Sequence, residues 1–192
     1  MEPQDPSLSK VQLWQSEIDH LTTECLTHFS GLSLKQLNWA PDERTWSIAQ
    51  NLTHVIRLNE SYFTIFNQLK AKNYTPSFWV KIPFLPKFMG KILLKSVQPT
   101  SKKKVKTAPL WEPDRTTASL KILTTFQQHQ KELKTHIHQM AALLPKGIVL
   151  SSPAHRHIVY PLETAICLLI AHEKRHLKKA KELTSQFPSG LH

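Results

Sequence analysis

Two histidines near the end of the chain, His172 and His176, have the clearest potential for chemistry. They stand in the segment His-Glu-Lys-Arg-His, which matches H-E-x-x-H, the zinc-binding motif of a large class of proteases. On an α-helix, side chains four residues apart lie on one face, about 6 Å apart at Cβ, so two imidazoles can bind one cation. The segment therefore suggests a metal site, and the rest of the sequence must decide whether that site would serve proteolysis.

The two histidines occupy consecutive positions of an apolar seam. Leucine or alanine stands at the other positions, such as Leu169 and Ala180. Burying an imidazole without a partner costs free energy, so each ring must either hydrogen-bond within the core or bind a metal. These two residues alone do not decide between a hydrogen-bonded core pair and a metal site.

A metal site needs a third ligand from another element, and His54 is the best candidate. It lies in the segment SIAQNLTHVIRL, at the edge of an apolar stripe and on the same helix side as Leu58 and Ile65. Taken alone, His54 would be interpreted as a surface histidine. Together with His172 and His176, it completes a predicted set of three imidazole ligands.

The protease interpretation is not supported by the rest of the chain. In H-E-x-x-H proteases the third ligand follows later in the sequence, but only sixteen residues follow His176. Glu182 lies in that stretch, yet no glycine breaks the helix to bring it round, and we expect no sheet to line a substrate cleft. Glu173 points about 100° away from His172 around the helix, and we expect it to be exposed to solvent. The sequence identifies no general base.

Four helices must position these histidines, because four segments carry apolar residues at spacings of three and four. They run from Val11 to Leu32, Ser47 to Leu69, Leu120 to Leu144 and Pro161 to Leu183. Ser47 and Gln50 have the spacing of a capping box at the start of the second helix. The chain has only 4 glycines, which disfavours an all-β fold with many tight turns. We predict an all-α fold, an antiparallel four-helix bundle, as a single domain over residues 1–192.

A long connection, residues 74–113, separates the second and third helices, and its segment KFMGKILLKSV is predicted to form a short amphipathic helix. Residues 87–106 contain seven lysines and no acidic residue, within a chain of net charge +11. A solvated loop is the simpler interpretation, in which Lys102, Lys103 and Lys104 are exposed. A rim that attracts anions is the alternative.

The composition also sets expectations about location and partners. No apolar run reaches the roughly 18 residues that a membrane-spanning helix needs, and the first residues lack the pattern of a signal peptide, so we expect a cytoplasmic protein without a membrane partner. Cys25 and Cys167 are then expected to be free thiols, with Cys25 inside the first apolar stripe. Aromatic residues do not alternate with the later lysines, so nucleic acid is not an expected partner. A homodimer is left open.

In combination, these features resemble the DinB/YfiT-like superfamily. The segment WSIAQNLTHV is similar to the family's Trp-Ser stretch before a ligand histidine, and IVYPLETAICLLIAHEKRHLKKAKEL is similar to its last helix. The long crossover before the third helix also matches, and the resemblance covers about residues 10–186. It implies a four-helix bundle in which His54, His172 and His176 bind a divalent metal ion, zinc or nickel.

The resemblance also implies a class of reaction. Characterised members include transferases and isomerases that use low-molecular-weight thiols, so the leading hypothesis is a metal-dependent S-transferase that acts on a small-molecule substrate. A metal-dependent hydrolase and a non-enzymatic basic helical binding module are the alternatives. The chain reads Ile158-Val159-Tyr160-Pro161 where the family often has a Phe-Gly pair, a departure that concerns the substrate pocket.

Overall fold

The computed structural model describes residues 6–101, 106–114 and 117–191. Four long helices make up most of it: α1 (Pro6–Phe29), α3 (Ile48–Lys70), α5 (Ile122–Gln139) and α6 (Leu162–Thr184). The shorter elements are the helices α2 (Leu34–Asn38) and α4 (Leu85–Val97), the 3-10 helices η1 (Phe78–Lys81), η2 (Pro109–Trp111) and η3 (Ala141–Lys146), and the strands β1 (Val149–Ser151) and β2 (Val159–Pro161). The mostly helical fold that the sequence predicted is therefore confirmed.

Local sequence signals explain where the helices begin. The Ser47 hydroxyl accepts from the backbone N–H of Gln50, and the Gln50 side chain accepts from the backbone N–H of Ser47. This predicted capping box satisfies two backbone donors that the first turn of α3 would otherwise leave free. Ser33 and Gln36 form a second capping box at α2, a short helix that the sequence analysis did not predict.

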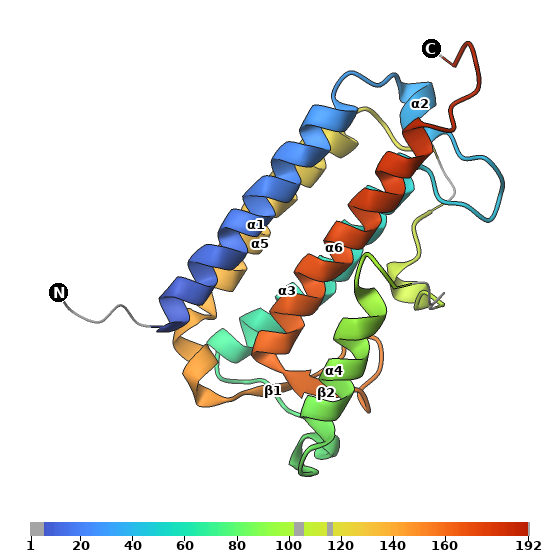
Figure 1. Cartoon of the computed structure of the whole chain (residues 1–192). Helices are drawn as coiled ribbons and strands as arrows, with labels where there is room; N and C mark the ends of the chain where they lie inside the picture. The colour runs from blue at the N-terminus through green and yellow to red at the C-terminus, as the bar shows by residue number, and fades with distance from the viewer. Residues whose placement is uncertain (1–5, 102–105, 115–116, 192) are drawn as a thin grey trace.

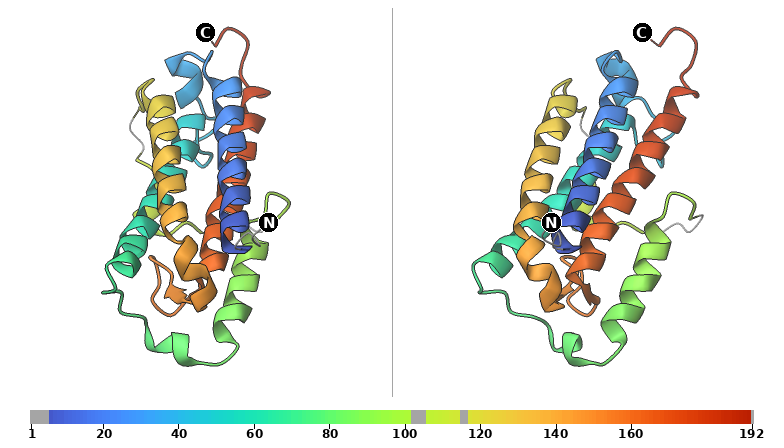
Figure 2. Two further views of the ribbon diagram at one scale, coloured as in Figure 1. Left: turned by 90° about the vertical axis from the view of Figure 1, so that its left-hand side faces the viewer. Right: turned by 60° about the vertical axis from the view of Figure 1, so that its left-hand side comes forward.

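The four long helices pack side by side, but not all neighbours are antiparallel. α1 and α6 run in one direction, and α3 and α5 run in the other (Figure 1 and Figure 2). The neighbouring pairs α1–α5 and α3–α6 are therefore antiparallel, as expected, whereas α3–α5 and α1–α6 are parallel. The long connection explains the difference, because it returns along the bundle so that α5 begins at the same end as α3.

The core lies between these helices and is built from the predicted apolar stripes. Cys25 is fully buried among them, as expected for a small apolar side chain. Burying one leucine, isoleucine or phenylalanine side chain contributes roughly 1.5–3 kcal/mol, so this core supplies much of the stability. Cys25 and Cys167 are both free thiols.

The connection contains the predicted amphipathic helix, α4, which packs on α6 and β2. Gly90 makes this close approach possible, because a Cβ atom there would lie 2.9 Å from Thr164 Cγ2 and 3.2 Å from Tyr160 Cβ. The strands β1 and β2 form a small antiparallel hairpin with Leu150 opposite Tyr160. The expectation of no sheet was wrong in this detail, because strands of three residues are too short to show a periodic pattern.

Two further expectations concern the surface. Within the described part of the chain, no helix is long and apolar enough to cross a membrane. Lys102, Lys103 and Lys104 lie outside the described residues, so their predicted exposure stays a prediction.

Candidate metal centre

The three histidines singled out in the sequence come together between α3 and α6. One nitrogen each from His54, His172 and His176 can be chosen such that all three atoms lie within 4.8 Å of one another. His54 and His176 are buried and His172 is partly buried. We refer to His54, His172 and His176 as the histidine cluster.

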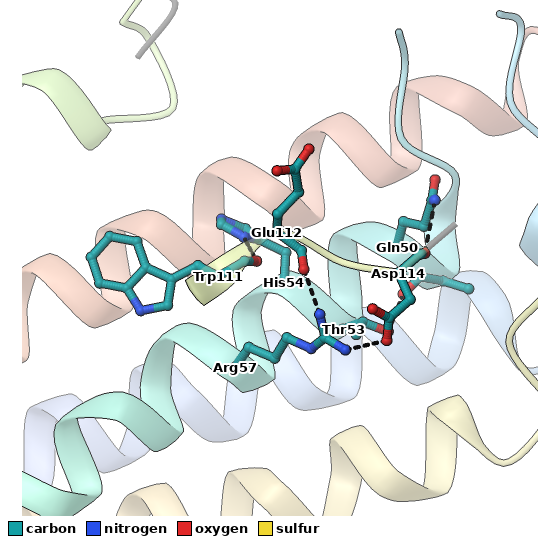
Figure 3. A network of polar contacts seen from close by, with 8 residues as sticks. Gln50, Thr53, His54, Arg57, Trp111, Glu112 and Asp114 are labelled. Carbon is teal, nitrogen blue, oxygen red and sulfur yellow. Dashed lines mark hydrogen bonds and ion pairs between the residues drawn. The ribbon is translucent and has the colours of Figure 1, made fainter. Parts of the chain in front are cut away.

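The backbone of η2 fixes the orientation of His54. Its Nδ1 lies 2.8 Å from the carbonyl oxygen of Trp111, and the two residues meet in this way in Figure 3. A carbonyl oxygen can only accept a hydrogen bond, so Nδ1 carries the proton and Nε2 keeps a free lone pair. That lone pair is the one available for a metal ion.

Asn51 does the same for His176. The Asn51 amide nitrogen donates to the carbonyl oxygen of Ser47 at 2.9 Å, which turns the amide oxygen toward His176 Nδ1, 2.8 Å away. Nδ1 of His176 therefore donates, and its Nε2 is also free to bind a cation. Hydrogen bonds of this kind to the outer nitrogen are typical of metal-ligating histidines, in which they fix the tautomer and the ring orientation.

His172 shows why the cluster is incomplete on its own. Its Nε2 lies 3.1 Å from Nε2 of His54, and its buried Nδ1 has no hydrogen-bond partner in the described part of the chain. If His172 donates from Nε2 to His54, its Nδ1 is left as an unsatisfied buried acceptor, which costs free energy. A cation between the rings would engage Nε2 lone pairs on all three histidines, and the proton of His172 would then lie on Nδ1, which has no partner among the described residues.

The surroundings keep the three rings uncharged near neutral pH. Burial lowers the pKa of His54 to about 4, although its hydrogen bond to Trp111 acts in the opposite direction. Burial also holds the pKa values of His172 and His176 well below the ordinary value, and neighbouring groups including Lys179 and Arg175 lower them further. Neutral imidazoles are the form that binds metal ions, so the histidine cluster could hold a divalent ion.

Aromatic and polar residues close the site on two sides. The Trp46 ring centroid lies 4.7 Å from that of His54 and 5.8 Å from that of His176. The segment 109–114 is tied across α3 by Arg57, which donates to the Glu112 carbonyl oxygen and pairs with the Asp114 carboxylate. Figure 3 shows this strap beside His54. The strap holds the Trp111 carbonyl in place for its hydrogen bond to His54.

Glu173 does not have the exposed position that the sequence suggested. It is 1% exposed, and its carboxyl group accepts a hydrogen bond from the Gln130 amide. Burial raises the pKa of Glu173 to about 8, although hydrogen bonds from Gln130 and Asn59 act in the opposite direction. The Asn59 amide nitrogen also lies 3.1 Å from His129 Nε2. We refer to Asn59, His129, Gln130 and Glu173 as the Glu173 cluster.

Part of this arrangement left signals in the sequence. On α6, Leu162, Ile166, Leu169, Glu173 and Ala180 continue one apolar seam at spacings of three, four and seven. That seam could have indicated the burial of Glu173, and the expectation of solvent exposure was wrong. The sequence contained no comparable signal for Trp111, because its contact with His54 joins residues 57 positions apart through a backbone atom.

Comparison with known proteins supports this description of the chain. The family model of the DinB superfamily matches residues 17–180. This range contains all three members of the histidine cluster. A search of curated proteins and a search of solved structures found no match to the chain.

Proposed function

The chain belongs to the DinB superfamily, and we propose that it is a metal-dependent transferase that joins a low-molecular-weight thiol to a small electrophilic substrate. His54, His172 and His176 would be the ligands of one divalent ion, zinc or nickel. The observation that carries this proposal is the pair of outer hydrogen bonds, from His54 to Trp111 and from His176 to Asn51, which leave two Nε2 lone pairs free beside His172. The thiol part of the proposal rests on the resemblance to family members that use such thiols.

The residues of the chain suggest how the site would work. His54, His172 and His176 would hold the divalent ion, which would supply a binding position where a thiol or water molecule would lose its proton more readily. Asn51 and the Trp111 carbonyl hold the rings so that they need not reorient during the reaction. Trp46 and the strap over α3 limit the access of water on their sides. No side chain is assigned as a general base.

Positive charge beside the histidine cluster favours an anionic thiol. Arg175 and Lys179 follow His172 on the same side of α6, at spacings of three and four residues. The Arg175 guanidinium donates to the Ser96 carbonyl oxygen at 2.6 Å, next to the end of α4, and burial together with the charge of Arg175 lowers the pKa of Lys179. A carboxylate-bearing thiol would be attracted to this end of the site.

The test is a panel of thiols with a chromogenic electrophile, run on protein purified without an affinity tag. We expect turnover that depends on one thiol, stops with a chelator and returns when metal is added. The double variant His54→Ala, His172→Ala should be inactive. The double variant His155→Ala, His157→Ala, which changes two exposed histidines before α6, should retain activity.

Other outcomes would assign the site differently. Turnover of esters or amides without thiol would replace the transferase by a metal-dependent hydrolase. Hydrolysis of casein that a chelator stops and Glu173→Gln abolishes would restore the protease interpretation. Metal binding without turnover across the panel would contradict the thiol-transferase proposal for those substrates.

A further inference from the structure

An apolar face without an evident role lies on the outside of α4 and on the segment before it. Phe84 is 85% exposed, Phe88 63% and Ile92 50%. Phe88 and Ile92 are four residues apart on α4, so they lie on one side of successive turns, and Phe84 immediately precedes the helix. The opposite side of α4 already packs inward through Gly90 and Leu93. We refer to Phe84, Phe88 and Ile92 as the outer row.

Two aromatic residues of η1 extend this surface. Phe78 is 71% exposed and Trp79 is 39% exposed, and η1 contacts α4 directly. In both views of Figure 2, η1 and the start of α4 project beyond the four long helices at the end of the molecule away from the C-terminus. The exposed residues of η1 and of the start of α4 therefore belong to neighbouring elements at a protruding end of the molecule.

Phe84 itself has an unusual backbone conformation. Phe84 has φ 63°, in the left-handed region, which is rare for a bulky residue other than glycine and costs roughly 1–2 kcal/mol. Its side chain nevertheless remains mostly in solvent. The chain therefore presents a large apolar side chain outward at an unusual backbone position.

A row of lysines runs beside the outer row. Lys87, Lys91 and Lys95 are all exposed and also stand four residues apart. No acidic residue occurs in the sequence between Glu60 and Glu112, so nothing from this stretch of the chain neutralises them. The positive charge of this face indicates a negatively charged partner.

Together, these features distinguish between possible partners. A second copy using the same face would place lysine against lysine, because a two-fold interface pairs a surface with itself, and the chain carries a net charge of +11. A nucleic acid would contact the lysines and stack on the aromatic side chains, but it offers no apolar interior for Ile92. A helix that carries apolar residues such as Phe88 and Ile92 beside a row of lysines, with Trp79 on the adjoining η1, is typical of attachment to the interface of a membrane.

We propose that this face docks on the surface of an anionic phospholipid membrane. The outer row enters the boundary between headgroups and acyl chains, and the lysine row lies at the phosphate groups, where long lysine side chains can keep their charge in water. Such attachment needs no spanning helix, and the described helices contain none. This proposal differs from the expectation that the protein has no membrane partner, because that expectation considered only membrane-spanning segments. The proposal does not depend on the metal site.

The experiment is sedimentation of the full-length protein with vesicles of phosphatidylcholine alone or of phosphatidylcholine mixed equally with phosphatidylglycerol. We expect binding to the mixed vesicles that falls with added salt, since salt screens the attraction of lysines to lipid phosphates. The triple variant Lys87→Gln, Lys91→Gln, Lys95→Gln should bind roughly 100-fold more weakly, at about fivefold for each lysine near the surface. The variant Phe84→Ser, Phe88→Ser should lose at least about tenfold, because two apolar side chains no longer enter the interface.

Matched controls separate this face from general charge and hydrophobicity. Lys35, Lys121 and Lys131 are exposed elsewhere, and their replacement by Gln removes the same charge. Leu13 is 67% exposed and Leu120 56%, and their replacement by Ser removes exposed apolar surface elsewhere. Both controls should bind vesicles nearly as well as the unmodified protein, and circular dichroism should show that every variant folds.

Three results would overturn the proposal. The first is an absence of binding to the mixed vesicles. Binding to a single-stranded oligonucleotide in their place would assign the face to nucleic acid. The second is equal weakening by the face variants and their controls. The third is a dimer, seen by analytical ultracentrifugation, that Phe84→Ser, Phe88→Ser dissociates, which would assign the face to self-association.

Discussion

The histidine cluster and the Glu173 cluster use adjacent residues of α6, His172 and Glu173, and both lie largely out of solvent between helices. In the Glu173 cluster, the amide groups of Gln130 and Asn59 donate to a carboxyl group and an imidazole. In the histidine cluster, by contrast, the hydrogen bonds of His54 and His176 point outward and the lone pairs point toward each other. The Glu173 cluster is joined by direct hydrogen bonds among its own members, although Glu173 Oε2, Gln130 Oε1 and Asn59 Oδ1 have no partner among the described residues. In the histidine cluster, three ring nitrogens instead converge on one point where a cation could bind.

This difference separates structural from chemical roles. Direct hydrogen bonds between buried side chains hold a core in one arrangement without a ligand. Acceptors that converge are costly unless a ligand joins them. We therefore expect changes in the Glu173 cluster to alter mainly stability, and changes around the histidine cluster to alter mainly metal binding.

The largest effect on stability is expected from Glu173→Ala. It leaves the Gln130 amide unpaired and opens a cavity, which together should lower the free energy of unfolding by about 3 kcal/mol. Glu173→Gln is the matched control, because a carboxyl group with a pKa of about 8 is mostly uncharged at pH 7 and an amide resembles that form. The control should cost less than about 1 kcal/mol. Urea unfolding measures both, and an equal cost for the two variants would show that the carboxyl group is not held by these partners.

The next effect concerns the histidine cluster. Asn51→Ala removes the acceptor that orients His176, and loss of such a partner typically weakens metal affinity about 10- to 100-fold. Asn67→Ala changes an exposed asparagine on the same helix and should leave affinity unchanged. Competition with a chromogenic chelator measures the affinity. Unchanged affinity in Asn51→Ala would mean that its hydrogen bond does not support metal binding.

A smaller effect is expected from the pH dependence of His129. Burial lowers the pKa of this imidazole to about 4, so between about pH 6.5 and 4 the unfolded chain binds a proton that the folded chain does not. Its contribution to stability is present above pH 6.5 and declines as the pH falls through that window. Between pH 7.5 and 5.5 the loss is about 1 kcal/mol for this group.

The measurement compares metal-free His129→Gln with the metal-free unmodified protein, so that the histidine cluster contributes equally to both. Urea unfolding at the two pH values should show a smaller decline in stability for the variant. Parallel declines would contradict the buried, uncharged state of His129.

The smallest effect is expected from three lysines that lie outside the described residues. Replacing Lys102, Lys103 and Lys104 by Gln should shift the melting temperature by no more than about 1–2 °C, because isolated surface changes are usually within about 0.5 kcal/mol. Differential scanning calorimetry measures the shift. A large loss of stability would mean that this segment packs against the bundle or against a second subunit.

The sequence predicted most of the helical frame, because helix starts and apolar seams are local patterns. The capping box of Ser47 and Gln50 located the start of α3, and the seam through His172 and His176 located two members of the histidine cluster. The parallel pairing of α3 with α5 could not be predicted with the same ease, since it depends on the path of the connection.

The partners of the histidines were harder to predict than the histidines themselves. Asn51 lies three residues before His54, but its bond is to His176, 125 positions away. Trp111 contributes a backbone atom, which carries no signature of residue type. Long-range contacts of this kind follow from the fold and not from any short segment.

The most direct test of the metal centre is metal analysis of protein purified without an affinity tag. We predict about one divalent ion per chain in the unmodified protein and in the control His155→Ala, His157→Ala, and almost none in His54→Ala, His172→Ala, since three imidazole ligands are needed to retain the ion. Substoichiometric metal in the unmodified protein after incubation with zinc and with nickel, or unchanged metal in the double variant, would contradict the assignment of the histidine cluster as a metal site.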